Sequence, residues 1–128
     1  MTNLERIKKF VFKGEEYQIE FPTVGEYIDI ENQKLIQSNG QWVNLLKNQT
    51  VSALRSIQII ECVSILMILC PKLFANMKVT SYKEIDAIDF LELLTLYNKE
   101  INPWYAEWFK QFNDVILGVN EKLKKEEE

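Results

Sequence analysis

The feature that most constrains the fold is an apolar segment in the middle of the chain, which ends in "SILMILCP". Its spacing predicts a helix from about Thr50 or Val51 to Leu69. Pro71 ends this helix, because proline has no backbone N–H with which to continue the hydrogen-bond ladder. From Ile57 onward the helix is apolar on almost every side. A helix of that kind is surrounded by other elements, so we expect it to form the centre of the fold.

The most apolar run of this segment, Cys62–Cys70, predicts a core helix and not a membrane span. Charged Glu61 precedes the run and Pro71 follows it, whereas a bilayer needs about 20 apolar residues. The N-terminal sequence "MTNLERIKKF" also carries charges where a signal peptide would be apolar. We therefore expect an intracellular protein with no membrane partner.

The N-terminal part of the chain, about residues 5–21, predicts a β-hairpin. Large apolar side chains recur there at every second position within two runs: Phe10 and Phe12, then Tyr17, Ile19 and Phe21. Alternation of this kind is typical of a strand with one buried face, and Gly14 suits the turn between the two runs. A hairpin alone is marginally stable in water, so its aromatic face is expected to pack on the helices.

Capping signals predict where the first helix begins. Thr23 stands three residues before Glu26, which is the spacing of a capping box. Residues with a helical period then follow: Val24, Tyr27, Ile28, Glu31 and Leu35. The "SNG" sequence at residues 38–40 ends this helix, and a short amphipathic piece is expected at about Trp42–Leu46.

Two further helices are predicted after a connecting stretch at 71–80. Ser81 with Glu84, or Asp86 with Asp89, can cap the first of them. Its apolar side is expected to contain the following residues: Ile88, Leu91, Leu94 or Thr95, and Leu96 or Tyr97. Asn102 followed by Pro103 then predicts the start of a separate last helix, because proline fits the first helical position.

These elements predict a mainly α (α+β) fold, in which an N-terminal β-hairpin packs on a compact bundle of about four to five helices. The chain of 128 residues can bury one core, whereas two would be cramped. We therefore predict a single domain, residues 1–128. It consists of the hairpin at about 5–21, a helical part at about 24–125 and a charged tail at 121–128.

Composition argues against several classes of function. The net charge of −4 offers no positive surface to a nucleic acid, and the chain contains no histidine, the commonest general base and metal ligand. Its glycines form no phosphate-binding loop. We predict no catalytic, cofactor-binding or metal-binding residue and no nucleic-acid partner. The one lead for an enzyme is Glu61, a carboxylate within the apolar helix.

The sequence "INPWYAEWFKQFND", residues 101–114, predicts a helix that carries two columns of large apolar side chains. The first column contains Trp104, Trp108 and Phe112, which either close the core or bind a partner; we favour the core. The second contains Tyr105, Phe109 and Ile116, which are the candidates for an exposed partner-binding patch. Surplus apolar surface of this kind favours a homo-oligomer or binding to an apolar client.

The "F-x-F-K-G-x-x-Y" hairpin from Phe10 to Tyr17, its "FPTVGEY" exit, the "NPWYAEWF" sequence and the charged C-terminus resemble those of the tail assembly chaperones of tailed bacteriophages. The resemblance implies a non-enzymatic protein in the cytoplasm of the infected bacterial host. Such a protein binds the long helical tape measure protein, keeps it soluble and helps tail tube protein to polymerise around it. The resemblance also implies a helix-in-groove mode of binding and no catalytic residue.

The resemblance leaves two alternatives open. A small virion structural subunit, in the tail or the connector, would use the same apolar surface for permanent contacts. A small carboxylate enzyme would need a pocket around Glu61. The Lys124–Lys125 pair can be encoded by a slippery A-rich heptamer, which in phage genes of this kind directs a frameshifted longer product.

Overall fold

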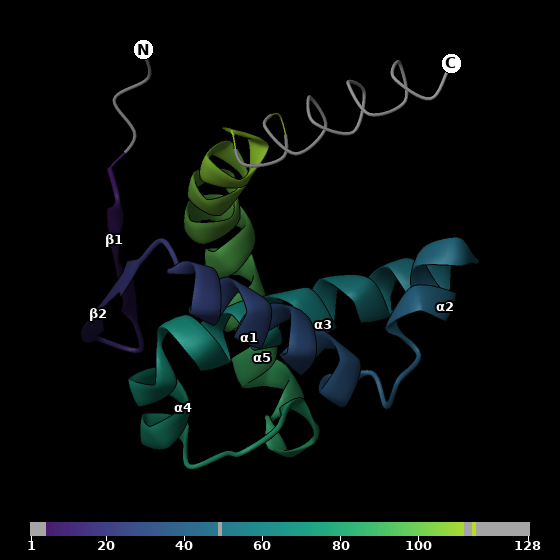
Figure 1. Ribbon diagram of the computed structural model, residues 1–128. Helices are drawn as coiled ribbons and strands as arrows, with labels where there is room; N and C mark the ends of the chain where they lie inside the picture. Colours follow the sequence, from purple (N-terminus) through teal and green to yellow (C-terminus); the bar gives the residue numbers. More distant parts are fainter. Residues whose placement is uncertain (1–4, 49, 112–113, 115–128) are drawn as a thin grey trace.

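The computed structural model describes residues 5–48, 50–111 and 114. A two-stranded antiparallel hairpin precedes the helices, and the predicted mainly α fold is confirmed. The elements are β1 (Ile7–Phe12), β2 (Glu15–Glu20), α1 (Val24–Gln37), α2 (Trp42–Lys47), α3 (Val51–Leu69), α4 (Pro71–Met77), η1 (Tyr82–Glu84), α5 (Ala87–Leu96) and the π-helical turn η2 (Tyr97–Ile101). In Figure 1 the hairpin and α2 lie at opposite ends of the molecule, with α1 and α3 between them.

The hairpin has the predicted alternation. Phe10 pairs with Tyr17 across the strands, their rings stack at 5.5 Å between centroids, and both side chains are buried. Val11, between Phe10 and Phe12, faces solvent. Lys13 and Gly14 both have positive φ, 51° and 78°, which is the backbone that a tight two-residue hairpin turn requires.

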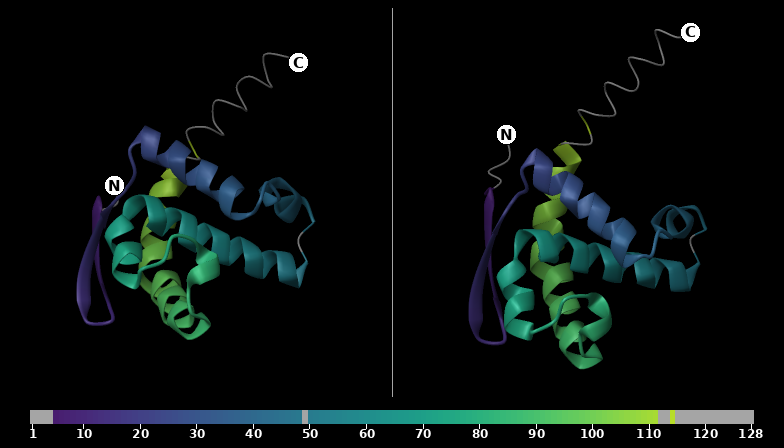
Figure 2. Two further views of the ribbon diagram at one scale, coloured as in Figure 1. Left: turned by 90° about the horizontal axis from the view of Figure 1, so that it is seen from below. Right: turned by 60° about the horizontal axis from the view of Figure 1, so that its bottom comes forward.

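The central position of α3 follows from its sequence. Thr50 caps its first turn by accepting a hydrogen bond from the Ala53 N–H, and Cys62–Leu66 are buried on every side of the helix. Helices α1, α2 and α4 pack around it, and Figure 2 shows α1 running alongside α3. By length and composition α3 could cross a membrane, a test that the core helix of a soluble protein also passes.

The residues after α3 differ from the prediction. They were expected to form a connecting stretch, but Pro71 occupies the first turn of a further helix, α4. Proline is suited to that position because its missing N–H has no partner to lose there. Lys78 ends α4 in the left-handed conformation, with φ 59°.

Helix α1 begins with the predicted capping box. The Thr23 hydroxyl accepts from the Glu26 N–H, and the Glu26 carboxylate accepts from the Thr23 N–H. The residues that this helix buries are not the ones whose spacing predicted it: Ile30, Lys34 and Gln37 are buried, whereas Val24, Ile28 and Leu35 are exposed. The Lys34 ammonium lies 5.4 Å from the centre of the Trp42 ring, and the Gln37 amide contacts Gln33 and Met67 Sδ. Hydropathy does not register contacts of this kind.

Helix α5 differs from the prediction in a similar way. Asp86 caps it by accepting hydrogen bonds from the Ile88 and Asp89 N–H groups. Of the two caps expected from the sequence, this is the second. Its buried residue is Leu93, whereas Ile88 and Leu91, which were expected on the apolar side, are exposed. The predicted apolar side is therefore wrong at these two positions.

The predicted helix start at Asn102 and Pro103 is also wrong. The chain remains helical from α5 through η2 into residues 102–111, which we call the tryptophan helix. Within η2 the Asn102 N–H donates to the carbonyl of Tyr97, five residues back. This wider turn directly precedes Pro103, whose ring would clash with the carbonyl four residues back in a regular α-helix.

Candidate functional site

The tryptophan helix packs against the N-terminal end of the hairpin. Trp104 and Trp108 both donate their indole Nε1–H to the backbone carbonyl oxygen of Glu5, at 2.6 and 2.9 Å. Phe21 lies between them, with ring centroids 6.1 Å from Trp104 and 5.6 Å from Trp108. The two tryptophans are both half-buried and therefore pack against the protein's own hairpin.

Tyr105 does not belong to an exposed patch, so that part of the expectation is wrong. Its side chain is 7% exposed and lies 5.2 Å from Phe21 between ring centroids. Because the helix does not restart at Asn102, Tyr105 continues a buried column that contains Tyr97 and Ile101. A helix that began at Asn102 would have separated Tyr105 from Tyr97 and Ile101, so this column was not expected from the sequence.

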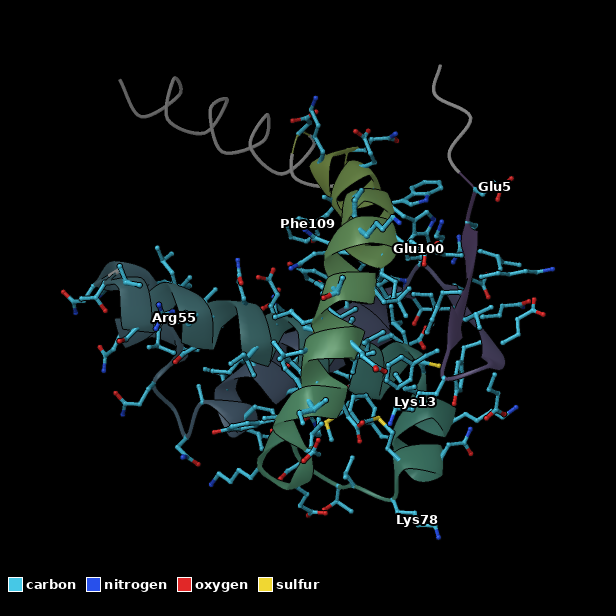
Figure 3. The ribbon with its side chains drawn as sticks, turned by 180° about the vertical axis from the view of Figure 1, so that it is seen from behind. Glu5, Lys13, Arg55, Lys78, Glu100 and Phe109 are labelled. Carbon is cyan, nitrogen blue, oxygen red and sulfur yellow. The ribbon has the colours of Figure 1, made fainter. Side chains whose placement is uncertain are left out.

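Phe109 lies next to Tyr105 in space and is half-buried. Its ring stacks on Tyr105 at 6.0 Å and on Tyr27 of α1 at 5.8 Å, between centroids. Figure 3 shows Phe109 on the side of the tryptophan helix away from Glu5. Phe112 and Ile116, the remaining members of the two predicted columns, lie outside the described residues.

Three buried groups, Tyr105, Tyr97 and Cys62, stay protonated at neutral pH. Burial raises the pKa of Tyr105, and the nearby Glu31 carboxylate raises it further. Burial, then Cys62 and Glu61, raise the pKa of the Tyr97 phenol. Burial also raises the pKa of the Cys62 thiol. A thiol that is buried and protonated is a poor nucleophile. Within the described ranges no group of three acidic, cysteine or histidine side chains could hold a metal ion.

A groove of about 710 Å³ opens between α1, α3, α4 and the segment that connects α4 to α5; we call it the α1–α4 groove. Its apolar lining consists of Ile36, Met67, Ile68, Pro71, Phe74, Ala75, Val79 and Tyr82. Its polar lining consists of Gln33, Gln37, Asn39, Thr80, Ser81 and Lys83. Ile36 is 63% exposed, whereas Phe74 is buried. The groove is therefore open and largely apolar.

Local hydrogen bonds hold two sides of this groove in place. The Gln37 amide donates to the Gln33 side chain at 3.1 Å and contacts Met67 Sδ at 3.5 Å, so α1 is tied to α3. On the other side the Thr80 hydroxyl donates to Glu84 Oε1 at 2.6 Å, which fixes the connecting segment. A groove with fixed sides can bind a partner without much loss of its own conformational freedom.

The lining of the groove is apolar with a polar edge. Among the described residues that line it, Lys83 is the one charged side chain, and the Glu84 carboxylate lies beside it on Thr80. An apolar groove with a polar edge is typical of sites that receive the apolar face of a helix. Glu61, the enzyme lead from sequence, is half-buried on α3 and does not line the groove.

Comparisons with known proteins add no relative: no protein-family model, no curated protein and no solved structure matches the chain.

Proposed function

We propose that this chain is a non-enzymatic tail assembly chaperone of a tailed bacteriophage, which binds the tape measure protein and assists assembly of the tail tube in the cytoplasm of the infected host. The sequence resemblance suggests the class of client. The observation that supports a particular binding site is the α1–α4 groove, an open apolar surface formed by three helices and the segment that connects α4 to α5.

The groove suits a helical client on the basis of its polarity. Apolar side chains at i, i+3 or i+4, and i+7 of a helix occupy one face, and that face needs an elongated apolar floor with a polar edge. Met67 supplies a flexible and polarizable side chain to the floor, and such side chains adapt to clients of varied sequence. Repeated apolar helical segments of a tape measure protein would fit such a surface.

Two exposed residues of α1 give a matched test. Ile36 lines the groove, whereas Val24 is 73% exposed and does not line it. They lie 12 positions apart in α1, which places them about 120° apart around the axis. Both sites are exposed, so aspartate should change the stability of the fold only by about 0.3 to 1 kcal/mol. The change is favourable at Val24 in the first turn of α1 and unfavourable at Ile36 in its last turn, because of the helix dipole, so melting temperatures of both variants are the control.

The experiment is co-expression of each variant with the tape measure protein of the same phage. Wild type and Val24→Asp should keep the tape measure protein in the soluble fraction and co-purify with it, whereas Ile36→Asp should not. Equal behaviour of the two variants would contradict the groove as the client site. Detection of the chain in purified virions would favour the alternative, a small structural subunit of the tail or connector.

A further inference from the structure

The outer edge of β2 has backbone hydrogen-bonding groups that the hairpin does not use. The Phe21 N–H donates to the Arg6 carbonyl, so this cross-strand pair is hydrogen-bonded. In an antiparallel ladder such pairs alternate with pairs whose N–H and C=O groups point outward. With Ile7 opposite Glu20, the outward positions of β2 are Glu16, Gln18 and Glu20. Within the described chain their backbone groups have no other partner.

The outer edge of β1 differs from that of β2 at its start. The Glu5 carbonyl points to that edge and accepts the two indole N–H groups of Trp104 and Trp108. Figure 3 shows the tryptophan helix beside Glu5 at the start of β1. The start of that edge is therefore occupied by this chain's own side chains.

A hollow of about 510 Å³ lies beside β2. It is lined by Glu16, Tyr17 and Gln18 of β2 and by residues 69–72, where α3 turns into α4. An added strand would run about 4.8 Å from β2, which places it at this hollow. The free edge and the hollow are independent observations, and both indicate space for an extended segment.

The charges along the edge select the occupant. Glu16 and Glu20 are exposed and share the outer face of β2 with Gln18. Arg6 pairs with Glu20 at 2.7 Å, whereas Glu16 has no ion-pair partner in the described part of the chain. A second copy paired antiparallel about Gln18 would place Glu16 opposite the partner copy's Glu20, and like charges at that distance destabilise a sheet. Lys72, which also lines the hollow, pairs with Glu15 at 3.5 Å. A lysine or arginine opposite Glu16 would instead complement the carboxylate that stays unpaired in the described part of the chain.

We propose that the free edge of β2 binds an extended, lysine- or arginine-containing segment of another protein as an added antiparallel strand. Backbone hydrogen bonds from Glu16, Gln18 and Glu20 supply the binding, and the Glu16 carboxylate, which Arg6 does not neutralise as it does Glu20, selects a basic side chain opposite it. The hollow shares Pro71 with the lining of the α1–α4 groove, but the test below uses a peptide and the β2 amides, so it does not depend on the identity of the client.

The probe is the fluorescent peptide acetyl-Lys-Val-Thr-Val-Lys-amide, titrated against the full chain and followed by fluorescence anisotropy. Gln18→Pro removes one outward N–H of β2, and the matched control Val11→Pro removes one outward N–H of β1. Gln18→Pro should weaken binding about tenfold, whereas Val11→Pro should leave it within about twofold of wild type. Circular dichroism of both variants checks that the hairpin is folded.

A second measurement keeps the proposal testable if Gln18→Pro does not fold. In the wild-type chain, the peptide should slow amide hydrogen exchange at Glu16, Gln18 and Glu20 and leave Ile7, Lys9 and Val11 unchanged. Glu16→Lys should weaken binding of the basic peptide and strengthen binding of its counterpart acetyl-Glu-Val-Thr-Val-Glu-amide. Binding without protection of the β2 amides would overturn the proposal, because it would be charge attraction alone. Protection that rises with protein concentration in the absence of peptide would overturn it in favour of a second copy.

Discussion

The tryptophan helix and the α1–α4 groove both gather apolar side chains, and they differ in what those side chains contact. On the tryptophan helix the large rings meet Phe21, Tyr27 and the Glu5 carbonyl, all within the same chain. In the groove, smaller side chains contact solvent: Ile36 is exposed and Ile68 is half-buried. Ring size therefore did not indicate which surface is available, because large rings also contribute most to a protein's own core.

The largest expected effect on stability comes from removing a buried ring of the tryptophan helix, and it tests whether that helix belongs to the protein's own core. Tyr105→Ala should destabilise the fold by about 3 to 5 kcal/mol, because it leaves a cavity among Phe21, Trp104 and Phe109. Tyr105→Phe keeps the ring and should cost less than about 1 kcal/mol. Urea unfolding of both variants measures this. A Tyr105→Ala variant with native stability but without client binding would show that Tyr105 belongs to the partner-binding surface.

The two tryptophans share one acceptor, which predicts a non-additive effect. In Trp104→Phe or Trp108→Phe the other indole still donates to the Glu5 carbonyl, so each single change should cost about 1 kcal/mol or less. The double variant removes both donors and should cost about 1 kcal/mol more than the sum of the singles. A double-mutant cycle by chemical denaturation measures the difference. Strict additivity would show that the shared carbonyl contributes nothing.

The buried phenols predict a loss of stability in base. Burial raises the pKa of Tyr97 above its ordinary value, so the folded chain keeps a proton that the unfolded chain releases near pH 10. This contribution is fully present below about pH 10 and is lost as the pH rises toward the folded pKa, by up to about 1.4 kcal/mol per pH unit. Urea midpoints between about pH 8 and 11 should fall less steeply in Tyr97→Phe than in wild type. Equal slopes would contradict a buried, protonated Tyr97.

The sequence was sufficient where a structure depends on neighbouring residues. The hairpin alternation of Phe10, Phe12 and Tyr17 and the capping box of Thr23 with Glu26 are local patterns, and all are present in the structure. Each depends on spacing within a few residues, which periodicity and capping rules describe directly.

The sequence was insufficient where a feature depends on tertiary contacts. The continuous helix through η2 hid the column of Tyr97, Ile101 and Tyr105, because Asn102 and Pro103 have the composition of a helix start. The α1–α4 groove joins side chains from positions 33 to 83, with α4 between them. No local pattern could have predicted that these segments meet.

The measurement that tests the central claim most directly is amide hydrogen exchange of the chain, alone and in complex with the tape measure protein. The account predicts new protection in the segments that line the α1–α4 groove, residues 33–39 and 67–75, with little change in the tryptophan helix at 102–111. Protection confined to 102–111, with an unchanged groove, would show that the aromatic side chains bind the client and would contradict the account.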